Sequence, residues 1–145
     1  MTTLDALQVA LAGEHAALYV YGVLGAQTSA SDTPQLFDSV SEAYETHRGR
    51  RDHLTGLVLE EGGTPVASES AYEIPRRLGT PSAVAEAALQ LERRSASTYA
   101  WLVANTVGGQ RRWAIDALTD AAVRELSYRG SPEIFPGADE STDRG

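Results

Sequence analysis

The sequence predicts an all-α fold, a bundle of four helices, and three observations support this prediction. Apolar residues recur at intervals of three and four along long segments, which places them on one face of a helix. Capping and helix-breaking residues divide the chain into four such segments. No segment alternates apolar and polar residues between hairpin turns, so we expect no β-strands.

The first two helices have clear beginnings and ends in the sequence. The first is predicted over residues 3–26, with Thr3 as its N-cap. The second is predicted over residues 33–61, because Pro34 suits a first helical turn and Gly62-Gly63 stops the helix.

The third and fourth helices are separated from the first pair by a long segment. They are predicted over residues 81–106, after Thr80 as cap, and over residues 110–129. The segment 62–79 before them spans roughly 60 Å when extended, whereas a 26-residue helix is roughly 40 Å long. We therefore predict a bundle with one long crossover between helices 2 and 3, rather than an up-and-down bundle.

Length, charge and cysteine content restrict the domain organisation and the function. The 145 residues are enough for one domain, which we place at residues 1–137, followed by an acidic flexible tail over residues 138–145. The net charge of −8, without a basic stripe, argues against nucleic acid as a partner. The lack of cysteine leaves carboxylates and imidazoles as metal ligands. The first residues of the sequence contain neither a basic region nor a continuous apolar run. We therefore expect neither export nor membrane insertion, and a cytoplasmic location.

Three ionisable residues stand at positions where the helical rhythm requires core residues. Glu14 continues the inner stripe of the first helix, His47 that of the second, and Glu92 that of the third. All three lie near the middle of their helices. Because buried charge must be paired, hydrogen-bonded or bound to a metal, we expect them to share one polar centre.

One interpretation of this centre is a metal site. Di-iron and di-manganese bundle proteins use one glutamate from each of two helices and a Glu-x-x-His pair from each of the others. Here Tyr44 stands where the motif of His47 requires glutamate, and the fourth helix has no histidine, so a two-metal centre is not expected. Glu14, His47 and Glu92 remain candidate ligands for one iron, manganese or zinc ion.

The interpretation that we prefer is a neutral network that specifies packing without catalysis. Arg51 lies one turn beyond His47, Arg124 lies near the inner face of the last helix, and tyrosine hydroxyls add hydrogen bonds. The predicted members of this network are Glu14, Tyr44, His47, Arg51, Glu92, Tyr99 and Arg124. A small-molecule binder or oxidoreductase that uses the same carboxylates is a third possibility, and no catalytic residue is assigned.

Several short motifs also resemble those of a known family. They are residues 11–17, residues 19–22, His47-Arg48, Arg51-Asp52, residues 72–75, Leu91-Glu92 and residues 135–137. In this order and spacing they are similar to the ferritin-like domain-of-unknown-function family typical of actinobacteria, over residues 4–137. The resemblance implies the ferritin-like four-helix fold, in a family without an established activity.

The crossover carries three apolar residues, Tyr72, Ile74 and Leu78. They either cover their own bundle or pack against a second subunit. We expect a homodimer formed through the crossover and the outer faces of the first two helices, with an isologous interface.

Overall fold

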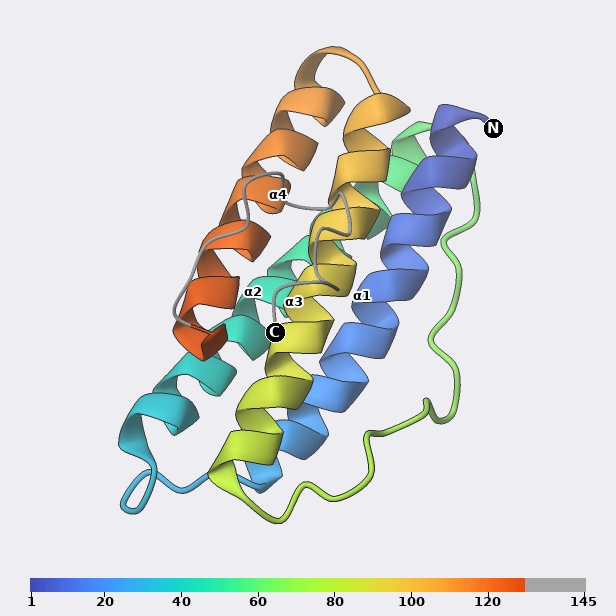
Figure 1. Ribbon diagram of the computed structural model, residues 1–145. Coiled ribbons are helices and arrows are strands. Elements are labelled where there is room, and N and C mark those ends of the chain that lie inside the picture. Colours follow the sequence, from blue (N-terminus) through green and yellow to red (C-terminus); the bar gives the residue numbers. More distant parts are fainter. Residues whose placement is uncertain (130–145) are drawn as a thin grey trace.

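The computed structural model describes residues 1–129, and all regular structure in this part of the chain is helical (Figure 1). The helices are α1 (Thr3–Ala26), α2 (Pro34–Glu60), α3 (Pro81–Ala104) and α4 (Gly108–Arg129). The predicted all-α fold of four helices is therefore confirmed. The predicted tail over residues 138–145, and the domain boundary before it, lie outside the described residues.

The helix ends differ from the prediction by a few residues. The N-cap of α1 is Thr2 and not Thr3, because Thr2 and Asp5 exchange hydrogen bonds between side chain and backbone in a capping box. Helix α4 starts at Gly108, two residues earlier than predicted. Gly108 has a φ of +56°, a backbone conformation that glycine adopts without steric cost.

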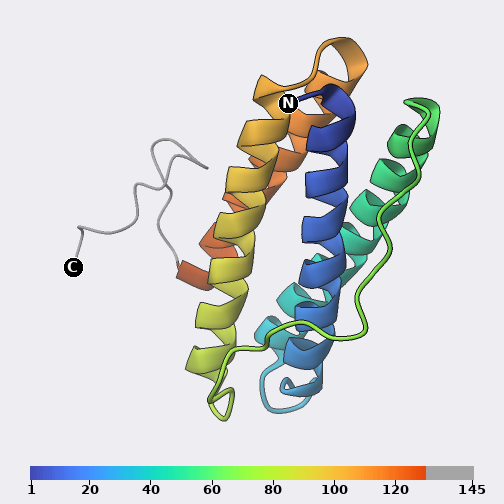
Figure 2. The same ribbon diagram turned by 90° about the vertical axis from the view of Figure 1, so that its right-hand side faces the viewer.

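The four helices lie along one another, and the connection from α2 to α3 runs the length of the bundle (Figures 1 and 2). Helices α2 and α3 consequently point in the same direction, while α1 and α4 point in the opposite one. The first part of the connection is fastened to α1: the amide of Gln8 donates to the carbonyl oxygen of Thr64 and accepts from the backbone of Val66. Further along, the ring of Tyr72 packs against Tyr19 at 5.6 Å.

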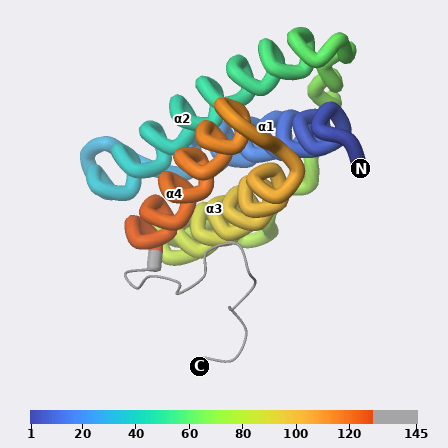
Figure 3. Tube along the Cα trace, turned by 90° about the horizontal axis from the view of Figure 1, so that it is seen from above, coloured from blue at the N-terminus to red at the C-terminus, as the bar shows by residue number. Residues whose placement is uncertain are grey.

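The core consists of two apolar clusters with a polar layer between them. Viewed from above, α1 lies beside α2 and α3 beside α4 (Figure 3), and the closest backbone packing occurs within these pairs. One cluster comprises Ala6, Leu7, Ala10, Leu11, Leu54, Leu57, Val58, Tyr99, Leu102, Ala114 and Ala117. The other comprises Val20, Tyr21, Leu24, Val40, Ala43, Val84, Ala87, Ala88 and Leu91. Along α1, Glu14 lies between the two sets.

Helix α1 is also rich in apolar residues. Among residues 1–129 it is the one helix long and apolar enough to cross a membrane by length and composition. A core helix of a water-soluble bundle passes the same test, and α1 buries Leu7, Leu11 and Leu24 completely inside this bundle.

Candidate functional site

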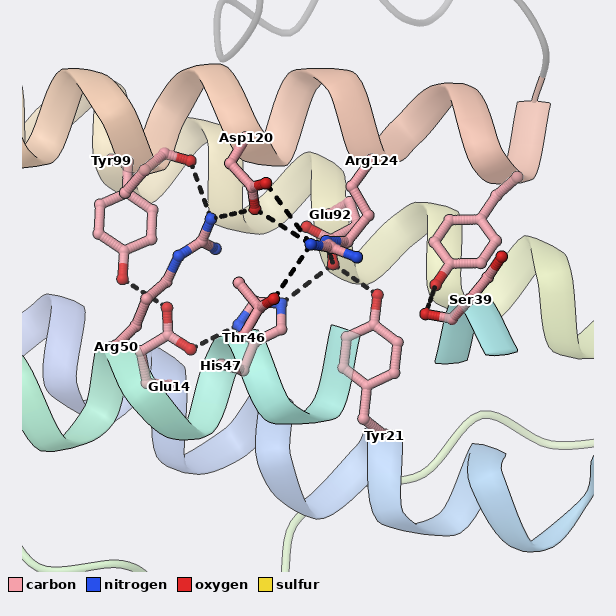
Figure 4. A network of polar contacts seen from close by, with 12 residues as sticks. Glu14, Tyr21, Ser39, Thr46, His47, Arg50, Glu92, Tyr99, Asp120 and Arg124 are labelled. Carbon is pink, nitrogen blue, oxygen red and sulfur yellow. Dashed lines mark hydrogen bonds and ion pairs between the residues drawn. The ribbon is translucent and has the colours of Figure 1, made fainter. Parts of the chain in front are cut away.

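The three inward charges predicted from the sequence meet at the middle of the bundle (Figure 4). Glu14 of α1, His47 of α2 and Glu92 of α3 are 2%, 0% and 0% exposed. His47 lies between the two carboxylates. Its Nδ1 is 2.5 Å from Oε2 of Glu14, and its Nε2 is 3.0 Å from Oε1 of Glu92.

This geometry determines the protonation state of His47. Carboxylate oxygens accept hydrogen bonds, so both ring nitrogens must carry a proton to bond on both sides, which is the imidazolium form. Burial alone would lower the pKa of His47. The attraction of Glu14, with the hydrogen bonds to Glu14 and Glu92, outweighs burial and raises this pKa to about 9. His47 is therefore a cation at neutral pH.

Two buried tyrosines complete the hydrogen bonds of the carboxylates. The hydroxyl of Tyr99 donates to Oε1 of Glu14 at 2.5 Å, and that of Tyr21 donates to Oε1 of Glu92 at 2.6 Å. Burial, reinforced by the neighbouring carboxylates, raises the pKa of both tyrosines, which therefore remain neutral donors. Tyr99 was predicted here, whereas Tyr21 was not among the predicted members of the network. Its signal was the hydroxyl itself, which needs a partner when it is buried.

Two arginines and an aspartate extend the centre toward α4. Arg50 donates to Oδ2 of Asp120 at 2.6 Å, and Arg124 lies 3.3 Å from the same oxygen. Arg124 also donates to Oγ1 of Thr46, and its Nε lies 3.8 Å from Oε1 of Glu92. The network formed by these charges is formally neutral, with three anions and three cations: Glu14, Glu92, Asp120, His47, Arg50 and Arg124.

The structure corrects two of the predicted members. The inward arginine is Arg50, which is 7% exposed, whereas Arg51 pairs with Asp52 at the surface. Both positions lie about one turn from His47, and the rotation of α2 within the bundle decides between them. Tyr44 is 36% exposed and lies beside a surface groove instead of the centre. Asp120 was not predicted, although its position four residues before Arg124 is typical of a helical ion pair.

Comparison with known proteins assigns the family. A family model described as a domain of unknown function, DUF4439, matches residues 6–140. The chain belongs to the DUF4439 family. A crystal structure of the conserved hypothetical protein rv2844 from Mycobacterium tuberculosis is similar, with 28% identity and a TM-score of 0.80. The similarity covers 88% of this chain and 95% of that one. No match was found among curated proteins.

These findings agree with the resemblance to an actinobacterial family of unknown function. They assign no activity to the DUF4439 bundle.

The arrangement of the candidate ligands does not suit one metal ion. A metal ion bound to Nδ1 of His47 would lie on the side of Glu14, and one bound to Nε2 would lie on the side of Glu92. In either position the imidazole ring separates the ion from the second carboxylate. Glu14, His47 and Glu92 consequently do not converge on a single point. In the described part of the chain, no group of three or more histidine, aspartate or glutamate side chains is placed to hold a metal.

A cavity of about 180 Å³ reaches the centre from the side, between α1 and α3. Its walls include Glu14 and Tyr99, together with Ser95 and Thr98. The cavity places a small, mostly apolar space with a few polar side chains next to the buried carboxylate of Glu14.

Proposed function

We propose that this DUF4439 chain is a non-enzymatic packing or interaction domain, a ferritin-like bundle held at its centre by protonated side chains. The observation that carries the proposal is the bridge of His47 between Glu14 and Glu92. In this bridge the imidazolium occupies the place between carboxylates that a metal ion takes in di-iron bundles. The course of residues 61–80 along the bundle, with α2 and α3 parallel, supports the ferritin-like connectivity.

The same bridge argues against acid–base catalysis at the centre. A general base should have a pKa near the working pH and a free lone pair. His47 has a pKa of about 9, and both of its nitrogens are engaged with carboxylates. Each oxygen of Glu14 likewise accepts a hydrogen bond, from Tyr99 or from His47. Both nitrogens of His47 and both oxygens of Glu14 are thus occupied in holding the helices together.

Elemental analysis of protein purified without chelator tests the proposal. We expect less than about a tenth of an equivalent of iron, manganese or zinc, and no thermal shift when these metals are added, because a ligand of the native state would stabilise it. A stoichiometric metal that is lost in Glu14→Ala would overturn the proposal and establish the mononuclear metal site.

A small-molecule binder at the same centre is a second candidate, favoured by the cavity beside Glu14. A side chain at Gly13 would project into this space, since a Cβ there lies 3.9 Å from Thr98, an ordinary contact. Native mass spectrometry can detect a molecule that remains bound through purification. A defined adduct that Gly13→Val removes would support this candidate, whereas a bare 15.5 kDa chain would speak against it.

Self-association through the crossover is a separate proposal. Tyr72 packs on Tyr19, and Leu78 packs against an apolar cluster of its own chain. Ile74 is 42% exposed and is the member of the trio most available to a second copy. Light scattering distinguishes the states: a mass near 15.5 kDa at micromolar concentration rules out the homodimer, and a doubled mass supports it.

A further inference from the structure

A groove of about 430 Å³ lies between the end of the crossover, residues 73–78, and the first half of α3. This volume is in the range of small-molecule sites. Its floor is apolar: Val20, Ala87 and Leu91 line it and are each at most 7% exposed. An aliphatic chain in this groove would contact side chains that already belong to the core.

Three arginines line the same groove, Arg76, Arg77 and Arg94. Within residues 1–129 no hydrogen bond or ion pair joins them to another side chain, unlike Arg50 and Arg124, which pair with Asp120. The chain has 20 acidic residues against 12 arginines, so partners are plentiful. A gathering of unpaired guanidinium groups in so acidic a protein indicates a site for an anion.

The backbone at Arg77 supports this interpretation. Arg77 has a φ of +63°, a region that residues other than glycine, asparagine and aspartate seldom adopt. Glycine would relieve this strain. Strained residues gather at functional sites, because the side chain is needed where the backbone places it.

We propose that this groove binds a small amphipathic carboxylate, with its aliphatic chain on the apolar floor and its carboxylate held by the arginines. Guanidinium groups bind carboxylates through paired, charge-assisted hydrogen bonds. Glu73 and Glu86 also line the groove, so the five charged side chains carry a formal charge of +1. This balance favours a monoanion over a polyphosphate. The groove shares Leu91 and Arg94 with the cavity beside Glu14, but Glu14, His47 and Glu92 do not line it. The proposal does not depend on the scaffold function proposed for the polar centre.

Calorimetric titration of the full-length protein with octanoate tests the site. We expect one octanoate per chain, and binding about tenfold weaker or less for octan-1-ol, which lacks the charge. Arg94→Ala should weaken octanoate binding by about tenfold for the same reason. The matched control is Arg112→Ala, which removes the same charge from an exposed position on α4 and should bind like the parent.

Arg77→Gly separates binding from folding. It should raise the melting temperature, because the positive φ is relieved, and at the same time weaken octanoate binding by about tenfold. A purely structural role for Arg77 predicts unchanged binding.

The following results would overturn the proposal. They are an absence of octanoate binding, equal binding of octan-1-ol, equal weakening by Arg94→Ala and Arg112→Ala, and co-sedimentation with phosphatidylglycerol vesicles without binding of free octanoate. The last result would assign the groove to a lipid surface. If a second copy fills the groove, the octanoate affinity should instead fall as protein concentration and measured mass rise, which also contradicts the proposal.

Discussion

Glu14 and Glu92 lie on opposite sides of one imidazolium and are equally buried, yet their carboxylates are held differently. Glu14 has one donor for each oxygen, Tyr99 for Oε1 and His47 for Oε2. Glu92 concentrates its contacts on Oε1, which accepts from Tyr21 and His47 and lies 3.8 Å from Arg124. Its Oε2 is buried and has no hydrogen-bond partner among the residues that the structure describes.

This difference shows that burial alone does not define the role of a carboxylate in the bundle. Oε1 of Glu92, on α3, is contacted by side chains from the other three helices: Tyr21 of α1, His47 of α2 and Arg124 of α4. The carboxylate of Glu14 joins α1, α2 and α3 only. We therefore expect Glu92 to hold the whole bundle and Glu14 to hold one side of it.

Alanine at the two positions should give the largest effect. Glu92→Ala leaves the charges of His47 and Arg124 without their shared partner, and should lower the free energy of unfolding by about 5 kcal/mol. Of the three cations, only His47 loses a partner in Glu14→Ala, so the free energy of unfolding should fall by about 3 kcal/mol. Urea denaturation measures both values. Equal losses, or a larger loss for Glu14→Ala, would show that Glu92 is not the junction.

The pH dependence of stability tests the imidazolium that both carboxylates share. The pKa of His47 is raised from 6.5 to about 9 in the folded state, so folded protein retains a proton that unfolded protein loses. The stabilisation is complete below pH 6.5 and is lost as pH rises through about 9. Within this window the free energy of unfolding should fall by about 1.4 kcal/mol per pH unit.

The control for this measurement is a variant that is destabilised elsewhere. Leu54→Ala removes a fully buried side chain from an apolar cluster and should keep the same slope, whereas His47→Gln should abolish it. A parent protein whose stability stays constant from pH 7 to about 9 would show that His47 is not the titrating group.

The four helices and the three central charges were predictable because long periodic segments define their inner faces strongly. Glu14, His47 and Glu92 interrupt those faces at mid-height, where an ionisable group cannot reach water. Their meeting followed from the similar height of the three positions. The choice of His47 as the bridge required the structure, since the sequence does not show which side chain lies between the others.

The remaining members were missed for local reasons. Successive helical residues point about 100° apart, so Arg50 and Arg51 are both close to the inner stripe, and the rotation of α2 selects Arg50. Asp120 is 44% exposed at its side chain and resembles any solvated acid in the sequence. The positive φ of Arg77 is set by the path of the crossover, which has no repeating pattern from which to predict it.

Glutamine substitutions should distinguish the two carboxylates without a cavity. In Glu14→Gln the carbonyl can accept from His47 and the amide can donate to the oxygen of Tyr99, so only the hydroxyl proton of Tyr99 loses its acceptor. In Glu92→Gln the amide takes the position of Oε2, where no acceptor is described. We expect Glu92→Gln to cost about 2 kcal/mol more than Glu14→Gln in urea denaturation, and a reversed order would contradict the assigned contacts.

The smallest difference should appear when each tyrosine loses its hydroxyl. Tyr99→Phe removes the donor described for Oε1 of Glu14 and leaves that oxygen buried, which should cost about 2 kcal/mol. After Tyr21→Phe, Oε1 of Glu92 still accepts from His47 and keeps Arg124 nearby, so the cost should be about 1 kcal/mol. Neither change alters charge or volume much, so paired urea denaturation compares the hydrogen bonds directly. Equal costs would contradict this expectation. They would mean that Oε1 of Glu92 needs the hydrogen bond from Tyr21 as much as Oε1 of Glu14 needs the hydrogen bond from Tyr99.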